Sequence, residues 1–241
     1  MKNIIITGAS RGLGLETANL LIKKGYKVIG ISRTKSNELN TLLLNNKEQF
    51  EFIEFDLGNP RKVQDELFKK YIKYDTPIYG FVNNAAIAYD DIATNMNLDS
   101  LENMFNINVF SPMLMTKNII RNMLLNKIKG SLIHISSISC HTGYKGLSMY
   151  ASSKSSIEAF SKNIAREWGP LGIRSNSIVA GFMETDMSSS LDESQKNRIY
   201  GRTSLKLPTS TLSVANTIEF LLSQESGSIT GQNIFVDSGT I

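Results

Sequence analysis

The chain is poor in the residues that build disulfide frameworks and metal clusters. Its 241 residues include one cysteine, Cys140, and two histidines, His134 and His141. A single cysteine excludes an internal disulfide framework, and this set of residues is too small for a zinc site built from cysteine and histidine. We therefore expect no metal centre.

Long apolar runs and clusters of one charge are also missing. No stretch of about 18 apolar residues is present, which argues against a membrane span. The glycine in MKNIIITG comes too early for the apolar core of a signal peptide. The net charge of +4 is spread along the chain and forms no basic arm for nucleic acid. We expect a cytoplasmic protein that binds neither membranes nor nucleic acid.

Short apolar, β-branched runs alternate with longer segments of helical period. This alternation predicts an α/β fold, a Rossmann-like, doubly wound sheet of seven parallel strands with helices on both faces. No linker or repeat divides the chain, so one domain is expected. Strands are expected at 2–7, 26–32, 50–55, 78–83, 130–137, 173–179 and 232–237. Helices are expected near 12–24, 36–46, 60–73, 99–125, 149–168 and 211–223.

Residues 184–210 break this alternation. The segment is polar, rich in serine and without a clear strand pattern. A connection of this length inside a compact domain is usually functional. We expect a substrate lid over the strand ends, within a single domain that spans 1–241.

The stretch ITGASRGLG, residues 6–14, joins the first strand to the first helix. Gly8 suits a tight turn, Gly12 lets backbone N–H groups approach a phosphate, and Gly14 permits close packing of helix on strand. The helix amino end adds unpaired N–H donors and a partial positive charge. The spacing differs from the usual G-x-G-x-x-G, so a plain structural turn is the alternative.

The end of the second strand indicates which dinucleotide would bind. Enzymes that use NAD usually carry an acidic residue there, whereas this chain has Ser32 and Arg33 and no acid before Glu38. A guanidinium can bind a 2′-phosphate with paired hydrogen bonds, and Arg11 of the glycine loop can reach the same region. NADP(H) is therefore the expected cofactor. The alternative is that Arg33 is only a solvated charge.

The pattern YASSK places Tyr150 and Lys154 on one face of a helix. A tyrosine with a pKa of about 10 is a poor acid or base at neutral pH. We expect the Lys154 ammonium to lower the pKa of Tyr150 into a useful range. Ser137 precedes Tyr150 at the end of a buried strand, and Ser136 is its rival on the opposite face of that strand.

A serine or cysteine hydrolase is the competing class of enzyme, because Cys140 and His141 follow Ser137 closely. The chain has no G-x-S-x-G elbow, however. The other histidine, His134, lies inside a predicted strand, where a core residue is more common than a catalyst.

Together these motifs resemble the short-chain dehydrogenase/reductase family, from TGASRGLG to GQNIFVDSG at residues 231–239. The chain is most similar to the bacterial 3-oxoacyl-acyl-carrier-protein reductases. The resemblance implies carbonyl reduction by NADPH, with Ser137 binding the substrate oxygen and Tyr150 donating the proton. Lys154 would also hold the nicotinamide ribose. Asn108 in NINVFSP would interrupt its helix and hold a water that passes protons to Lys154, and Asn106 is its rival.

The resemblance also assigns the residues that contact the cofactor. Asp56 and Leu57 would lie at the adenine, Asn83 and Ala85 of NNAA at the adenosine, and Met183 and Thr185 at the nicotinamide. The full expected set is Gly8, Ser10, Arg11, Gly12, Leu13, Gly14, Ser32, Arg33, Asp56, Leu57, Asn83, Ala85, Tyr150, Lys154, Met183 and Thr185. Ala86 departs from the family's glycine, which is a small change. Ala180 stands where a proline is usual, which leaves the path of the chain into the lid open.

For the substrate, the resemblance implies a 3-oxoacyl thioester on an acyl carrier protein. Lys127, Lys129 and Arg174 could offer a basic surface to this acidic partner. The end of the lid, YGRTSLKLPTSTLS, lacks the acids that usually follow its proline in these reductases. A polyketide, a sugar or a small ketone is therefore the alternative substrate.

Two further expectations follow from the resemblance. Regulators that keep the fold without turnover typically lose the tyrosine or the lysine, so a non-catalytic NADP-binding regulator is less favoured here. The family commonly forms tetramers, so we expect a homotetramer or dimer that assembles through the helices holding Asn108 and Tyr150.

Overall fold

Seven strands form one parallel sheet in the order β3-β2-β1-β4-β5-β6-β7. The computed structural model describes residues 1–185 and 191–241. The strands are β1 (Asn3–Thr7), β2 (Lys27–Ser32), β3 (Phe50–Glu54), β4 (Ile78–Asn83), β5 (Ser131–Ser137), β6 (Arg174–Ala180) and β7 (Asn233–Val236). Every neighbouring pair is parallel. The predicted α/β fold is confirmed, and each strand begins and ends within one residue of its expected position.

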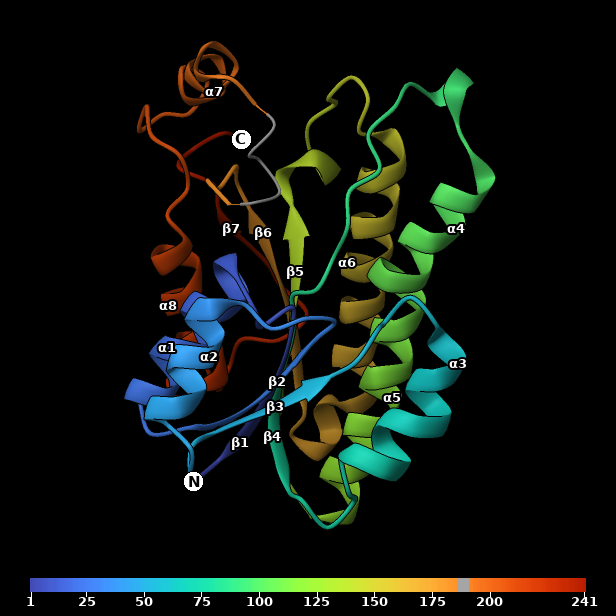
Figure 1. Ribbon diagram of the computed structural model, residues 1–241, viewed down its shortest axis with the longest axis vertical. Coiled ribbons are helices and arrows are strands. Elements are labelled where there is room, and N and C mark those ends of the chain that lie inside the picture. The colour runs from blue at the N-terminus through green and yellow to red at the C-terminus, as the bar shows by residue number, and fades with distance from the viewer. Residues whose placement is uncertain (186–190) are drawn as a thin grey trace.

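Helices cover both faces of the sheet (Figure 1). On one face lie α1 (Gly12–Lys23), α2 (Asn37–Asn45) and α8 (Thr211–Leu222). On the other lie α4 (Leu98–Phe105), α5 (Ser111–Leu125), α6 (Ser148–Trp168) and α3 (Pro60–Lys62), which continues as a π-helical segment, Val63–Tyr71. Successive side chains of β1 point to opposite faces of the sheet. Ile4 and Ile6 belong to the buried cluster on one face, and Ile5 belongs to the cluster on the other.

The strand order places a crevice at one edge of the sheet. β1 continues to β2 on one side and β4 continues to β5 on the other, so the connections diverge between β1 and β4. In doubly wound sheets, ligands bind at this point, outside the carboxyl ends of the strands. The residues that follow each strand therefore form the candidate site.

The helices differ from the ranges predicted by helical period at Asn108 and inside the predicted lid. A π-helical segment, Asn106–Phe110, separates α4 from α5, where one long helix was predicted. An additional helix, α7 (Glu193–Tyr200), lies inside the predicted lid. Its capping box joins the Asp192 carboxylate to the Gln195 N–H at 2.8 Å and the Gln195 side chain to the Asp192 N–H at 2.9 Å.

The predicted lid lies at the end of the molecule to which the strands point (Figure 1). α7 is at this end, beyond the carboxyl ends of β5, β6 and β7. Residues 186–190 of the predicted lid lie outside the described residues. Within the described residues, no helix has both the length and the apolar character that crossing a membrane requires.

Candidate active site

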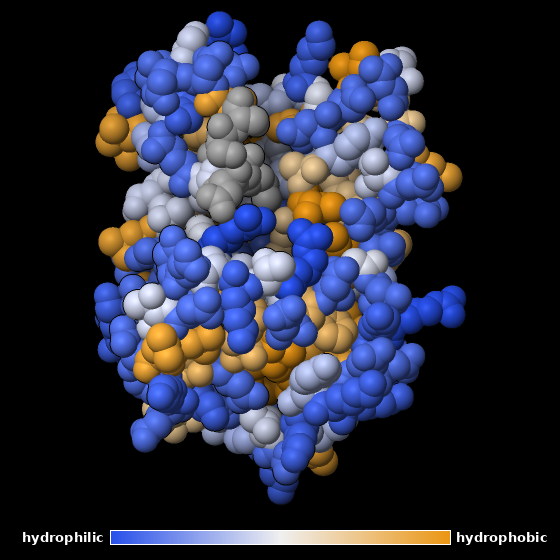
Figure 2. Space-filling model, viewed as in Figure 1, coloured by the Kyte–Doolittle hydropathy of each residue, from blue (hydrophilic) through white to orange (hydrophobic). Residues whose placement is uncertain are grey.

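A cavity of about 1040 Å³ occupies the carboxyl edge of the sheet. Its lining begins at the glycine loop and the end of β2, passes the ends of β4 and β5, and reaches α7. In the space-filling view this end of the molecule is hollowed between the side that carries α7 and the side that carries α4 (Figure 2). The volume lies at the upper end of the range for small-molecule and cofactor sites.

The glycine loop forms one end of this cavity. Gly8 and Gly12 have φ angles of +69° and +52°, which side chains rarely adopt. α1 begins at Gly12, so the unpaired N–H groups of its first turn lie at the cavity, as an anion site requires. Gly14 does not line the cavity: a Cβ there would collide with the Gly8 carbonyl oxygen, in agreement with its expected packing role.

Asn84 ties the glycine loop to the loop after β4. Its side-chain amide donates to the carbonyl oxygens of Thr7 at 2.9 Å and Gly8 at 3.3 Å. In return, the Thr7 hydroxyl accepts from the N–H groups of Asn84 and Ala85, both at 3.0 Å. These bonds hold the loops after β1 and β4 together, so Ala85 lines the cavity beside the glycine loop.

The end of β2 forms the side wall next to the glycine loop. The Ser32 hydroxyl accepts from the Ser10 N–H at 3.2 Å, so it stabilises the loop. Arg11 and Arg33 both line the cavity here, as do Leu13, Asp56 and Leu57. The Asp56 carboxylate accepts from the Gly58 N–H at 2.9 Å, which fixes the turn after β3. This wall therefore offers two guanidinium groups and one fixed carboxylate.

The assignment of Asn83 to the cofactor site is wrong in its geometry. Asn83 is the last residue of β4, 4% exposed, and its amide lies 3.4 Å from Nδ1 of His134. It does not line the cavity, whereas Asn84, Ala85 and Ala86 do. Strand alternation turns the Asn83 side chain away, toward the buried face that also holds Phe81 and His134.

Ser137, Tyr150 and Lys154 converge at the centre of the cavity. Ser137 ends β5, Tyr150 lies in the first turn of α6, and Lys154 follows one turn later. The Lys154 ammonium donates to the Ile135 carbonyl oxygen at 2.8 Å and lies 5.8 Å from the centroid of the Tyr150 ring. The Ser137 hydroxyl contacts Tyr150 directly. Ser136, the rival serine, binds Glu158 on the other side of the strand.

The expected lowering of the Tyr150 pKa is not found. Burial raises the pKa of Tyr150 well above its ordinary value, with smaller contributions from Cys140 and Asp90, and the hydrogen bond of Ser137 opposes the rise. Burial also lowers the pKa of Lys154, to about 8. Because both groups are desolvated, the cost of a buried charge outweighs the attraction between phenolate and ammonium. Tyr150 is therefore a protonated donor across the physiological range.

Asn108 lies behind the cavity and does not line it. It sits inside the π-helical segment, 2% exposed, so the helix is interrupted at this residue as expected. Its side chain accepts from the Ile87 N–H at 3.0 Å and donates to the Ile87 carbonyl oxygen at 2.9 Å and to the Ser153 hydroxyl at 3.0 Å. The Asn108 side chain thus holds the loop after β4 against α6.

The segment after β6 forms the far wall. Met183 and Thr185 line the cavity, together with Ile199 and Arg202 at the end of α7. Aromatic contact between Phe182 and Tyr200, 6.1 Å between ring centroids, packs this segment against α7. The described part of the predicted lid therefore contributes directly to the cavity.

Several cavity residues were missed from the sequence. Asp90 follows β4, and burial raises its pKa. Tyr144 and Lys145 lie in the loop between Ser137 and Tyr150, where their position in sequence could have indicated them. Arg202 carried no such signal, because it lies in the segment predicted only as a lid.

The basic surface proposed for a carrier protein is in the wrong place. Arg174 begins β6, at the sheet edge opposite the cavity, and its guanidinium donates to the carbonyl oxygens of Ile229, Leu221 and Ser223. Lys127 and Lys129 precede β5 at the same opposite edge. Besides Lys154, the cavity lining near α7 and α6 includes the cations Lys145 and Arg202.

The residues that suggested a hydrolase each bind other partners. The His141 imidazole binds the Glu158 carboxylate, whereas the Ser137 hydroxyl accepts from Ser139 and the Cys140 thiol contacts the Ala151 carbonyl oxygen. His134 is fully buried and edge-on to Phe81 and Phe160, and burial lowers its pKa to about 3. Over the described part of the chain, no group of His, Cys, Asp and Glu side chains could hold a metal ion.

The donor set fits a nicotinamide dinucleotide. The positive-φ glycines and the amino end of α1 suit a pyrophosphate, and Arg11 and Arg33 line the cavity beside them. Tyr150 and Lys154 line the same cavity.

Comparisons with known proteins agree with this geometry. A family model described as enoyl-(acyl carrier protein) reductase matches residues 8–240. The chain is 31% identical over 240 residues to an L-xylulose reductase of Caenorhabditis elegans, covering 99% of this chain and 95% of that protein. It is 32% identical over 244 residues to the 3-oxoacyl-[acyl-carrier-protein] reductase FabG of Buchnera aphidicola subsp. Baizongia pistaciae, covering 99% of this chain and 96% of that protein.

Solved structures share the fold along the whole chain. The structure of 4-hydroxyisoleucine dehydrogenase complexed with NADH superposes with a TM-score of 0.93 at 24% identity, covering 100% of this chain and 98% of that one. The structure of ElxO with NADP bound superposes with a TM-score of 0.87 at 26% identity, covering 99% of this chain and 98% of that one.

Proposed function

Because the chain belongs to the short-chain dehydrogenase/reductase family of oxidoreductases, we propose that it is an NADPH-dependent reductase of ketones, acting on 3-oxoacyl thioesters. One observation carries the proposal. Ser137, Tyr150 and Lys154 meet at the centre of a cavity whose other end is a glycine loop flanked by Arg11 and Arg33. A proton donor and a loop suited to a dinucleotide thus line the same cavity.

The choice of NADPH rests on charge at the end of β2. Arg33 and Arg11 line the cavity there, and Ser32 takes the place of the acid that an NAD enzyme usually carries. Two guanidinium groups favour a 2′-phosphate, because paired hydrogen bonds to phosphate oxygens are strong and directional.

In the proposed mechanism, Ser137 donates a hydrogen bond to the substrate carbonyl and holds it beside Tyr150. When bound, the nicotinamide supplies a hydride to the carbonyl carbon. The Tyr150 hydroxyl gives its proton to the carbonyl oxygen as negative charge develops there. The Lys154 ammonium stabilises the tyrosinate that remains. Asn108 keeps the loop after β4 in place and serves the return of a proton to Tyr150 through water.

The substrate proposal rests on sequence relatives and on charge. A 3-oxoacyl-[acyl-carrier-protein] reductase is among the relatives, and Lys145 and Arg202 would attract the phosphate of a carrier-bound substrate. The second candidate is a sugar or a small ketone. The similarity to an L-xylulose reductase and the Asp90 carboxylate, a partner for hydroxyl groups, favour it.

The first test is turnover of a short 3-oxoacyl thioester and of L-xylulose, each followed by NADPH oxidation. We expect thioester turnover that Tyr150→Phe reduces by about 100- to 10,000-fold, the usual contribution of a general acid, while the Kd for NADPH stays within about twofold. Turnover of the sugar alone would replace the thioester as substrate. Retained turnover in Tyr150→Phe would refute the catalytic role.

The cofactor proposal has a separate test in Arg33→Ala. We expect the Kd for NADPH to rise by about 10-fold or more, since a charge-assisted hydrogen bond contributes about 1.5–3 kcal/mol, while the Kd for NADH stays unchanged. Fluorescence titration of both cofactors measures this. Equal weakening of NADH and NADPH would contradict recognition of the 2′-phosphate by Arg33.

A further inference from the structure

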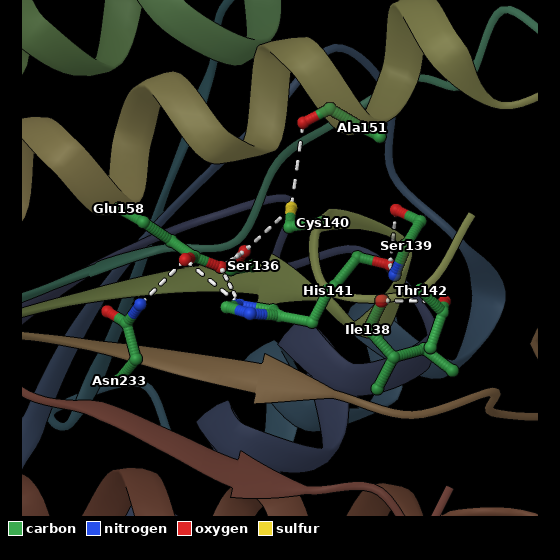
Figure 3. A network of polar contacts seen from close by, with 10 residues as sticks. Ser136, Ile138, Ser139, Cys140, His141, Thr142, Ala151, Glu158 and Asn233 are labelled. Carbon is green, nitrogen blue, oxygen red and sulfur yellow. Dashed lines mark hydrogen bonds and ion pairs between the residues drawn. The ribbon is translucent and has the colours of Figure 1, made fainter. Parts of the chain in front are cut away.

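One carboxylate holds both ends of the segment that carries Ser137. Glu158 accepts a hydrogen bond from the Ser136 hydroxyl, just before Ser137, and from Nε2 of His141, 3.1 Å from each carboxylate oxygen. Between them, the chain forms the 3₁₀ turn Ile138–Cys140. Figure 3 shows the Glu158 side chain reaching from α6 toward Ser136, His141 and Asn233. We call residues 136–141 the serine turn.

Glu158 is built into the protein interior. It is 7% exposed, and the Asn233 side-chain amide donates to its second oxygen at 2.6 Å. A buried carboxylate is costly unless its oxygens accept hydrogen bonds, and here Ser136, His141 and Asn233 supply them. The His141 ring also packs on Phe235 of β7, 4.9 Å between centroids. Glu158 thus joins α6, β5, β7 and the serine turn.

The same helix carries the other two catalytic candidates. Tyr150, Lys154 and Glu158 are spaced by four residues, which places them on one stripe of α6. Lys154 binds the Ile135 carbonyl oxygen at 2.8 Å, and Glu158 binds the next residue, Ser136. The stripe therefore fixes the end of β5 relative to Tyr150.

Within the serine turn, the Ser137 hydroxyl depends on its neighbours. It accepts from the Ser139 N–H at 3.2 Å and from the Ser139 hydroxyl at 3.0 Å. The Cys140 thiol adds a longer contact to the Ala151 carbonyl oxygen at 3.6 Å, next to Tyr150. Because Ser137 lies between Ser136 and His141 in this short turn, we expect a shift of either end to change the distance from Ser137 to Tyr150.

We propose that Glu158 is a positioning residue, which sets the Ser137 hydroxyl in register with Tyr150 by clamping both ends of the serine turn. This rests on the proposed function, because Glu158 acts only through Ser137. Glutamine has the same size, but its NH2 group requires one of the present donors to turn and accept, so the set of hydrogen bonds around residue 158 must rearrange.

The test compares Glu158→Gln with Glu167→Gln, an exposed position on the same helix. We expect Glu158→Gln to lower kcat by about 10- to 100-fold, the scale of a misplacement of about 1 Å, with KM and the NADPH Kd within about twofold. Glu167→Gln should match the wild type. An unchanged kcat in Glu158→Gln would overturn the proposal.

A double-mutant cycle separates positioning from general structural damage. In a Ser137→Ala background, Glu158→Gln should lower kcat by less than about twofold, because the group it positions is gone. Equal losses of kcat with and without Ser137 would overturn the proposal. If Glu158→Gln does not fold, His141→Phe takes its place in the cycle, because it keeps the ring on Phe235 and removes one clamp.

Amide hydrogen exchange at the serine turn tests the role of Glu158 without measuring turnover. It can therefore show whether this inference or the proposed function has failed. Faster exchange at residues 136–141 in Glu158→Gln, and not in Glu167→Gln, is expected whichever carbonyl is reduced. Unchanged exchange would overturn the clamp itself. Turnover retained in Tyr150→Phe would instead remove the proposed function and leave the exchange result standing.

Discussion

The ammonium of Lys154 is subject to two opposing effects. The buried position, 5% exposed, lowers its pKa to about 8, while the Ile135 carbonyl oxygen accepts a hydrogen bond from it. Below about pH 8 the group carries its positive charge, and the charge is lost as the pH rises through that value. Its proposed role beside Tyr150 requires the charged form.

We therefore predict that kcat for reduction falls as the pH rises through about 8. Tyr150 cannot cause this decline, because its raised pKa keeps it protonated there. In Lys154→Arg, any turnover that remains should lose the decline, since a guanidinium stays charged. A kcat profile from pH 6 to 10 measures both. A decline at the same pH in Lys154→Arg would assign it to another group.

At the site, the sequence predicted where the catalytic candidates lie better than it predicted their burial and pKa values. Tyr150, Lys154 and Ser137 could be placed because helical spacing and a strand end are local properties. The pKa of Tyr150 could not be predicted, because its burial depends on distant segments that line the same cavity, including Asp90 and Tyr144. Asn83 was misassigned because a change of one residue at a strand end turns the side chain to the other face.

At the scale of elements, α1 packs closely on the glycine loop at Gly14. Any Cβ at this position meets the Gly8 carbonyl oxygen and the Asn84 side chain. The glycine loop has no room to retreat, because Asn84 ties it to the loop after β4.

We predict that Gly14→Ala lowers the free energy of unfolding by about 1–3 kcal/mol, the usual cost of overpacking, and weakens NADPH binding. Thermal unfolding should show a Tm lower by about 2–4 °C per kcal/mol. Gly169→Ala is the matched control, since a Cβ there meets nothing within 4 Å. A wild-type Tm in Gly14→Ala would show that the loop can yield.

The regular elements could be predicted because their signal is periodic. Buried parallel strands such as β1 have an apolar run at their centre, and the α6 segment carries the helical period over many turns. The family resemblance implied the interruption at Asn108, but helical period alone could not predict the π-helical segment Asn106–Phe110, because Asn108 binds the distant Ile87 backbone. α7 was missed because its sequence is polar and none of its residues is buried.

At the scale of the whole molecule, apolar side chains remain exposed near one helical layer. Phe110, between α4 and α5, is 49% exposed, and Leu125 at the end of α5 is 67% exposed. These residues lie at the two ends of α5, the helix through which the family resemblance implies assembly.

We predict a homo-oligomer, of two or four times the 26.8 kDa chain mass, by light scattering. Phe110→Glu should shift the mass toward that of the single chain, because a carboxylate at an apolar interface is costly to bury. Leu44→Glu is the control, since Leu44 is 68% exposed on α2, across the sheet. A wild-type protein with the mass of one chain would contradict the prediction.

The strand order also sets a sequence of events during synthesis. β2 can pair with β1, and β3 with β2, before the rest of the sheet is made, but the other edge of β1 is uncovered until β4 emerges. From β4 onward, each new strand joins the edge left by the one before it, so the nascent sheet grows in a single direction. The glycine loop and its neighbours are therefore in place early, and the wall formed by Ile199 and Arg202 closes the cavity only near the end of translation.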